Sequence, residues 1–284
     1  MPFVVPIETA QASYPDYEFI AALTPSEQKA AFHVVARDGG EHLCLKIINP
    51  DYEAERLDRE IRALQTIDHQ NVVHLREYTF TITSSGNRHY MIEEFIDGTD
   101  LKDQLVSGNP WPVERAAQFF AQVCDGLGTV HAARIVHRDL KPSNIRVRPR
   151  DVPVIIDFGV ARHLSLPDLT RMSQGAALGT PAYFAPEQFT GTRDDIDHRT
   201  DLFAVGILLY QAVTGNHPFL RDNMTYQQLS DAVCTGNGHF EVANFTNLPD
   251  AWQLVLGRLL EKQRSRRPQN ASQVSAILRR IGGA

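Results

Sequence analysis

The chain has 284 residues, 43% of them hydrophobic and 22% charged, and its formal net charge is −6 with His neutral. This length suits one large domain or two lobes that share a core, and the composition is ordinary for a globular protein. An acidic balance argues against nucleic acid or an anionic membrane as the main partner, so we expect neither.

The N-terminal residues, the most apolar stretch and the cysteines indicate the cellular compartment of the protein. The start, MPFVVPIETAQ, has no basic region and no long apolar run, so we expect no signal peptide. The most apolar stretch, residues 202–213, is too short to span a bilayer and predicts a buried helix. Cys44, Cys124 and Cys234 lack metal-ligand spacing, which predicts buried thiols in a reducing compartment. We therefore expect a cytoplasmic protein without membrane contact in this chain.

The first third of the chain predicts mainly strands. Residues 17–48 have the pattern of three short strands, and residues 53–67 have the apolar spacing of a helix. Residues 72–82 and 88–96 predict a strand pair joined by the turn SSGN. Residues 1–96 are thus expected to form a small sheet with one helix.

The remaining chain, residues 97–284, predicts mainly helices. A long helix is expected over 111–135, with Pro near its start, and short strands are expected within 145–157. The segment 160–184 is irregular and rich in Ser, Thr and Gly, and a loop of that length is usually functional or disordered. Residues 185–281 predict further helices.

Five motifs occur in a fixed order along the chain. They are the LCLK strand ending at Lys46, then Glu60, VHRDLKPSNI (136–145), Asp157-Phe158-Gly159 and Ala185-Pro186-Glu187. In this order and spacing they resemble the protein kinase family. The resemblance implies an α+β, two-lobed kinase-like fold. Its N-lobe (1–96) has a small antiparallel sheet plus one helix, and its C-lobe (97–284) is mainly helical.

The resemblance also implies ATP and Mg²⁺ as cofactors. Asn144 and Asp157 would be the metal ligands, since magnesium prefers hard oxygen donors. Lys46 would contact the phosphates and form an ion pair with Glu60. These roles suit phosphoryl transfer, which depends on positioning and on neutralising phosphate charge.

Two residues of the VHRDLKPSNI motif match the reacting end of the family's site. Asp139 would accept or orient the proton of the attacking hydroxyl, and Lys141 would lie near the transferring phosphoryl group. Thr180 would contact Asp139 and help to dock the substrate.

Further matches concern the activation loop and the support of the larger lobe. Arg138 often pairs with an activation-loop phosphate in such kinases, and Thr170 and Ser173 are the candidate acceptors, although an unmodified polar loop is an equal alternative. Glu187 is expected to pair with Arg267, and Asp201 is expected to brace the catalytic loop backbone. The resemblance implies that the Glu187–Arg267 pair and Asp201 are structural supports.

The phosphate-covering loop departs from the family. TPSEQKAAF (24–32) stands where the family has a glycine-rich loop, and no glycine precedes Gly39. Thr24, Ser26 and Lys29 offer hydroxyls and a charge, whereas Pro25 removes an amide donor. Side chains hinder the close approach of amides to phosphate, so we expect weaker or slower nucleotide binding.

The adenine pocket also departs from the family. The family's hinge aligns with residues 92–101, which makes Glu94, Ile96 and Asp100 candidate nucleotide contacts and places Glu93 at the gatekeeper position. Arg146 replaces an apolar residue on the pocket floor, and Cys44 replaces Ala on its roof. We hypothesise a Glu93–Arg146 ion pair. The alternative is that Arg146 turns to solvent and Glu93 meets Lys46.

The sequence favours a serine/threonine protein kinase that transfers the γ-phosphoryl group of ATP to a protein hydroxyl and autophosphorylates its activation loop. Lys141 and GTPAYFAPEQ (179–188) are typical of that class, and the sequence of this stretch most resembles the family's bacterial branch. One alternative is a pseudokinase or regulatory binding module with a degenerate nucleotide pocket. Another keeps the fold with a different phosphoryl acceptor. Because the chain stops where a kinase domain would end, we expect either a free-standing kinase or a piece of a longer one.

Overall fold

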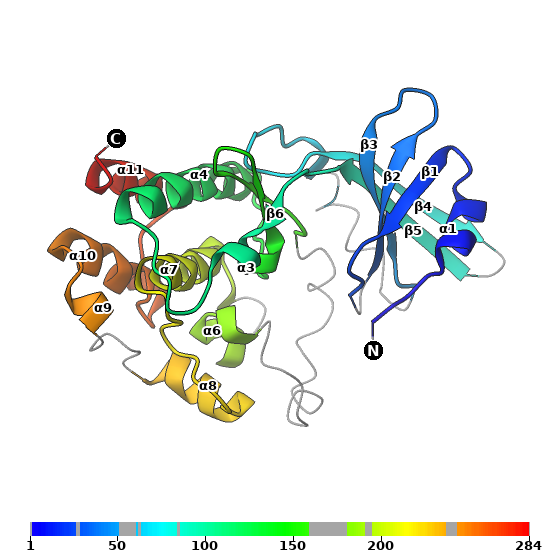
Figure 1. The fold of residues 1–284 in the computed structure, drawn as a ribbon. Helices are drawn as coiled ribbons and strands as arrows, with labels where there is room; N and C mark the ends of the chain where they lie inside the picture. Colours follow the sequence, from blue (N-terminus) through cyan, green and yellow to red (C-terminus); the bar gives the residue numbers. More distant parts are fainter. Residues whose placement is uncertain are drawn as a thin grey trace. The chain divides into compact units, whose positions relative to one another are not determined.

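The computed structural model shows the fold of most of the chain (Figure 1). It describes residues 2–26, 29–50, 61, 64–83, 86–158, 181–190, 195–236 and 243–283. Within these residues the chain forms two compact units. We call them the N-lobe (residues up to 96, without 70–72) and the C-lobe (70–72 and the residues from 97 onward).

The N-lobe is built on one antiparallel five-stranded sheet with the order β1-β2-β3-β5-β4. Its strands are β1 (Tyr17–Ala22), β2 (Lys29–Ala36), β3 (His42–Ile48), β4 (Leu75–Thr83) and β5 (Gly86–Glu94). Gly40, with φ 67°, lies in the turn between β2 and β3, where a left-handed residue is needed. The three strands expected in 17–48 and the later strand pair are confirmed, with shifted bounds.

A helix that the sequence analysis missed precedes the sheet. The helix α1 spans Ile7–Ser13, and Ala10 is buried in the core cluster that contains Phe32 and Val34 of β2. Seven residues without a side-chain cap are too few to show a helical pattern, so packing against the sheet fixes this helix. Of the helix expected over 53–67, the structure describes helical residues at 61 and 64–65; the other predicted positions up to 60 lie outside the described residues.

The C-lobe is organised around the helix α7 (His198–Thr214). It contacts α4 (Val113–Ala132) and α10 (Asp250–Leu259), and α4 also contacts α11 (Ala271–Ile281), which lies beside it in Figure 1. Helix α7 is apolar on all sides and almost wholly buried, as a central helix must be. The remaining helices are α3 (Leu101–Gln104), α6 (Pro186–Thr190), α8 (Tyr226–Cys234) and α9 (Ala243–Thr246).

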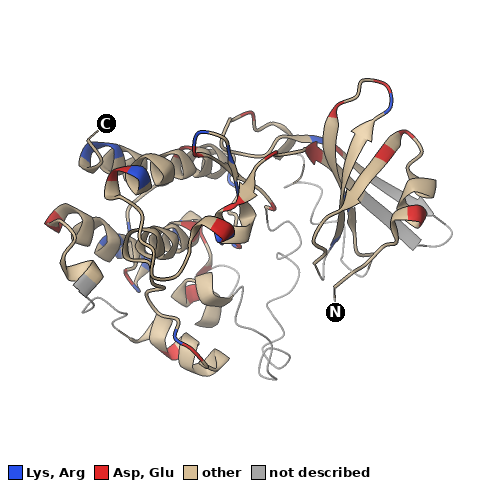
Figure 2. Ribbon diagram, in the orientation of Figure 1, with Lys and Arg blue, Asp and Glu red and all other residues tan. Residues whose placement is uncertain are grey.

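Local signals explain where the C-lobe helices begin and end. Asp197 caps α7 by accepting a hydrogen bond from the amide of Arg199, and Gly215 ends it with φ 71°. In α11 the basic residues Arg279 and Arg280 lie in the last turn, where they complement the helix dipole. Figure 2 shows blue ribbon, marking Lys or Arg, near the C-terminus.

A small three-stranded sheet carries the loops of the candidate site. It consists of β6 (Thr99–Asp100), β7 (Ile145–Arg148) and β8 (Val152–Ile155). Just before β6, Gly98 has φ 145°, and a Cβ atom there would lie 2.1 Å from the carbonyl oxygen of Val147. Only glycine permits this approach of two backbones.

The cysteines are all free thiols. Cys44 and Cys124 are buried as expected, and burial raises the pKa of the Cys124 thiol far above its ordinary value. Cys234 is only partly buried, so the expectation was wrong there. Among the helices that the structure describes, none is long and apolar enough to cross a bilayer.

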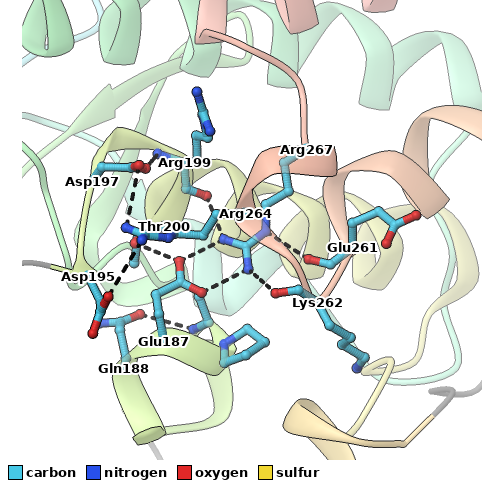
Figure 3. Close-up of polar contacts among 12 residues, drawn as sticks. Glu187, Gln188, Asp195, Asp197, Arg199, Thr200, Glu261, Lys262, Arg264 and Arg267 are labelled. Carbon is cyan, nitrogen blue, oxygen red and sulfur yellow. Dashed lines mark hydrogen bonds and ion pairs between the residues drawn. The ribbon is translucent and has the colours of Figure 1, made fainter. Parts of the chain in front are cut away.

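The expected pair of Glu187 and Arg267 is buried in the C-lobe (Figure 3). Arg267 donates Nη1 and Nη2 to the two carboxylate oxygens of Glu187 at 2.7 and 2.8 Å. Its remaining N–H groups donate to the carbonyl oxygens of Arg199, Glu261 and Lys262, which satisfies all five donors. The pair ties α6 to the segment before α11.

We predict that Arg267→Met strongly destabilises the C-lobe. The change leaves the Glu187 carboxylate buried without its cation, which costs about 3–5 kcal/mol in comparable pairs. Urea unfolding followed by circular dichroism measures the loss. The control is Arg76→Met, because the Arg76–Glu41 pair is about half exposed and such pairs contribute at most about 1 kcal/mol. Equal losses in the two variants would contradict the assignment.

Candidate active site

The buried carboxylate of Asp201 binds the backbone of the catalytic loop, the VHRDLKPSNI segment (136–145), as expected. Its Oδ2 accepts the amide of His137 at 2.9 Å and its Oδ1 accepts the amide of Arg138 at 2.8 Å. The imidazole of His131, on α4, bonds to Oδ2 at 2.8 Å. Burial alone would raise the pKa of Asp201, but the interactions with His131 and His137, chiefly the hydrogen bond with His131, outweigh it, so the pKa lies below its ordinary value.

His137 is locked in one neutral tautomer. Its Nδ1 accepts the amide of Asp139 at 3.3 Å, so the proton belongs on Nε2, which faces the carbonyl oxygen of Ile156 at 3.0 Å. Burial lowers the pKa of His137 despite nearby carboxylates. The ring also packs against Phe158, with ring centroids 4.9 Å apart. His137 therefore fastens the catalytic loop to the chain after β8 without carrying a charge.

Three predicted site residues meet within the loop. Lys141 Nζ donates to Asp139 Oδ2 at 3.0 Å. Asn144 Nδ2 donates to the carbonyl oxygen of Asp139 at 2.8 Å and is 3.3 Å from Asp139 Oδ2. The cation and the amide thus both hold Oδ2 of the Asp139 carboxylate.

The strand pair β7–β8 brings Asn144 and Asp157 to the same end of a hairpin. Ile145 pairs with Ile155 in antiparallel register, so the residue before β7 lies beside the residues after β8. The amide of Ile156 donates to the carbonyl oxygen of Asn144 at 2.9 Å. Asp157 has φ 58°, a left-handed conformation that is uncommon for a non-glycine residue and marks a constrained position.

Sequence reasoning missed three residues that support this site. They are His131, described above, Gln188, whose Nε2 donates to the carbonyl oxygen of Arg138 at 2.9 Å, and Asn71, whose Nδ2 donates to the carbonyl oxygen of Pro153 at 2.7 Å. Their only sequence signal is a polar residue within an apolar or helical stretch, which is too common to single out a position.

In the N-lobe, Lys46 forms a buried ion pair with Glu93. Only 4% of the surface of Lys46 and 6% of that of Glu93 are exposed, so the pair is shielded from water. This is the arrangement that the sequence analysis gave as the alternative for Glu93. Glu60, the other expected partner of Lys46, lies outside the described residues.

In the C-lobe, Arg146 contacts the chain around β6. Its Nη1 donates to Asp100 Oδ1 at 2.8 Å, and its Nη2 donates to the carbonyl oxygen of Gly98. The guanidinium is therefore held by the protein, and the idea that it turns out to solvent was wrong. The Glu93–Arg146 pair joins residues of different lobes and stays a prediction.

The remaining predicted nucleotide contacts lie in or beside the strands. Ile96 and Cys44 are buried, and Glu94 Oε1 accepts the amide of His74 at 3.0 Å. Gly159 and the activation-loop candidates Thr170, Ser173 and Thr180 lie outside the described residues.

The loop between β1 and β2 is closed by its own polar groups. The amide of Ser26 donates to the carbonyl oxygen of Lys29 at 2.9 Å, and the amide of Lys29 donates to Ser26 Oγ at 3.2 Å. The carbonyl oxygen of Ser26 accepts the amide of Phe3 at 2.7 Å, which fastens the N-terminal segment to the loop. The amides of Ser26 and Lys29 are thus already hydrogen-bonded within the protein.

The fold and the catalytic loop define the class of the protein, and comparison with known proteins gives its family. The protein kinase domain family matches residues 28–277, so the chain belongs to the protein kinase family.

Bacterial serine/threonine-protein kinases are among its relatives. The chain is 33% identical over 252 residues to serine/threonine-protein kinase pkn2 of Myxococcus xanthus, covering 84% of this chain and 29% of that protein. It is 30% identical over 259 residues to serine/threonine-protein kinase PknB of Mycobacterium leprae, covering 87% of this chain and 40% of that protein. The chain therefore spans less than half the length of these relatives.

A solved structure shares the fold. It is that of Rad53 1-466 in complex with AMP-PNP, with a TM-score of 0.74 and 23% identity over 93% of this chain and 65% of that chain. This likeness confirms the expected kinase fold.

We predict that the folded protein loses stability as the pH falls below about 6.5, the ordinary pKa of histidine. The pKa of His137 is lowered in the folded state, so unfolding takes up a proton below that pH. One proton contributes a slope of at most about 1.4 kcal/mol per pH unit. Urea unfolding between pH 7.5 and 5 measures the slope. His137→Gln cannot titrate and should flatten it, and an unchanged slope in that variant would contradict the assignment.

Proposed function

We propose that the chain is a Mg²⁺-dependent serine/threonine protein kinase that transfers the γ-phosphoryl group of ATP to a protein hydroxyl. The observation that carries this proposal is the geometry of the catalytic loop. It holds the Asp139 carboxylate 3.0 Å from Lys141 Nζ and beside the Asn144 amide, on a backbone braced by Asp201. The protein kinase family membership and the bacterial serine/threonine kinases among the relatives support it.

Each residue of the loop has a chemical task in this reaction. Asp139 orients the attacking hydroxyl and receives its proton, and the contact with Lys141 fixes the carboxylate. Lys141 also places a positive charge where the transferring phosphoryl group carries negative charge. Because Asp201 and His137 hold the loop backbone, these groups need little reorganisation during the reaction.

The donor set at the end of the β7–β8 hairpin fits magnesium. Asn144 uses its Nδ2 on Asp139, which turns the amide oxygen away as a hard ligand, and Asp157 supplies a carboxylate. Among the described residues there is no cluster of three or more His, Cys, Asp or Glu side chains that could hold a metal. Magnesium does not need one, since it usually takes one or two protein oxygens together with substrate phosphates and water. When bound, the ion neutralises the negative charge of the phosphates.

The other groups extend the proposal to the nucleotide. Lys46 is the family's phosphate-contacting lysine, with Glu94, Ile96, Asp100, Cys44 and Arg146 as candidate nucleotide contacts. The loop around Ser26 contributes fewer free amides than a glycine-rich loop, so we propose weaker nucleotide binding than glycine would give. The free thiols of Cys44 and Cys124 support a reducing, cytoplasmic location. Protein substrates are proposed from the GTPAY stretch, and autophosphorylation from Thr170 and Ser173.

We predict that the purified chain transfers labelled phosphate from γ-labelled ATP with Mg²⁺ to itself or to a generic basic protein. Asp139→Ala should lower transfer by about 10²–10⁴-fold, because general-base residues contribute that much. Asp157→Asn should abolish it by removing a metal ligand. Mass spectrometry should find phosphate on Thr170 or Ser173. The matched control is Asp231→Ala, an aspartate on α8 whose hydrogen bonds are exposed.

Two outcomes would overturn the proposal. No transfer, together with no thermal shift on adding ATP and Mg²⁺, would identify a pseudokinase or a regulatory binding module. Transfer that survives both substitutions would come from a contaminating enzyme. Phosphate found only outside residues 160–184 would reject activation-loop autophosphorylation alone.

A further inference from the structure

The pairing of Lys46 follows from the register of two strands. On β3 and β5, Cys44 lies opposite Glu93, and Lys46 lies opposite Met91. Side chains two residues apart on a strand share a face of the sheet. Lys46 and Glu93 are therefore diagonal neighbours on one face, within reach of long side chains, and their head groups form the ion pair.

Because the Lys46–Glu93 pair is buried, its two charges interact more strongly than those of an exposed pair. An exposed ion pair contributes little, but here both side chains are less than a tenth exposed. A buried ammonium without a counter-ion is costly and tends to lose its proton or its position. The carboxylate of Glu93 thus keeps Lys46 charged and directed along this face of the sheet.

The strands fix the geometry of the pair. Both partners belong to neighbouring strands of a hydrogen-bonded sheet, so their separation is fixed by the strand register.

We propose that Glu93 is a positioning residue for Lys46: a strand-borne carboxylate that keeps the lysine charged and aimed at the nucleotide phosphates. This rests on the proposed function, in which Lys46 contacts those phosphates. At this position the family usually has an apolar residue or Thr. A carboxylate that supports the phosphate-binding lysine from position 93 would therefore distinguish this chain from most of the family. Glu93 acts through Lys46 and does not read the adenine.

The first test is a double-mutant cycle on nucleotide binding. Affinities for ATP, ADP and adenosine are measured by calorimetry for the unmodified chain, Glu93→Gln, Lys46→Met and the double variant. Glu93→Gln should weaken ATP and ADP binding about tenfold, in line with the coupling of close charge pairs, and leave adenosine within about twofold. In the Lys46→Met background, Glu93→Gln should change ATP affinity less than about twofold, because its effect passes through Lys46.

The matched control is Glu77→Gln. Glu77 lies on β4 of the same sheet and is partly buried, and its carboxylate accepts hydrogen bonds from Thr79 and Tyr90. Neutralising it should leave all three affinities unchanged. Equal weakening of ATP and adenosine by Glu93→Gln would make Glu93 an adenine contact and overturn the proposal. Full additivity with Lys46→Met would also overturn it.

A second measurement separates this proposal from the proposed function. In nucleotide-free protein, acylation of lysines by a small anhydride is followed residue by residue by mass spectrometry. Glu93→Gln should raise the labelling rate of Lys46 severalfold relative to the other lysines, because a buried ammonium that loses a carboxylate partner yields more neutral amine. Glu93→Asp keeps the charge and should restore the slower rate.

The outcomes of the two tests are distinct. If the unmodified chain binds no nucleotide, the proposed function fails, and the labelling result still decides whether Glu93 controls Lys46. If Lys46 labels at the same rate with and without the carboxylate, the positioning role is rejected, whatever the chain binds. Thermal midpoints of every variant confirm that each is folded before it is compared.

Discussion

The bond of the Asp201 carboxylate to two backbone amides is the constraint on which the catalytic loop depends. Arg138 has φ 62°, a left-handed conformation that costs a non-glycine residue free energy. The amides of His137 and Arg138 donate to Asp201, and Gln188 donates to the carbonyl oxygen of Arg138, so three hydrogen bonds compensate for this strain. Asp201 itself lies on the buried helix α7, which gives the loop the rigidity of the C-lobe core.

The same helix connects the loop to the second buried carboxylate of the C-lobe. Thr200, next to Asp201, donates its hydroxyl to Glu187 at 2.8 Å, and Glu187 is also held by Arg267. Because Gln188 follows Glu187, the chain that carries them is fixed both to α7 and to the backbone of Arg138. The C-lobe therefore holds the candidate catalytic loop through two buried carboxylates, Asp201 and Glu187, whose oxygens are all hydrogen-bonded. Removing one partner of such a buried group is strongly destabilising.

The N-lobe uses charge in a different way. Its β1–β2 loop has Ser26 where the family usually has glycine. The amides of Ser26 and Lys29 are hydrogen-bonded within the loop, and the carbonyl oxygen of Ser26 accepts the amide of Phe3 in the N-terminal segment. Lys46, in contrast, is held by a carboxylate on the adjacent strand. In the proposed role of Lys46, a lysine fixed by strand register would attract phosphate independently of the amides of this loop.

The sequence by itself determined the family and most of the main elements, and it supplied the candidate reactive residues, because the motifs around Lys46, Asp139 and Asp157 occur at the family's spacing. It also determined the Glu187–Arg267 pair and the role of Asp201. Only the tertiary structure decided the helix α1, which packing and not periodicity stabilises, and the supports His131, Gln188 and Asn71. It also assigned Lys46 to Glu93 and Arg146 to Asp100. Strand register and packing decide which charged side chains become neighbours, and both depend on residues far apart in the sequence.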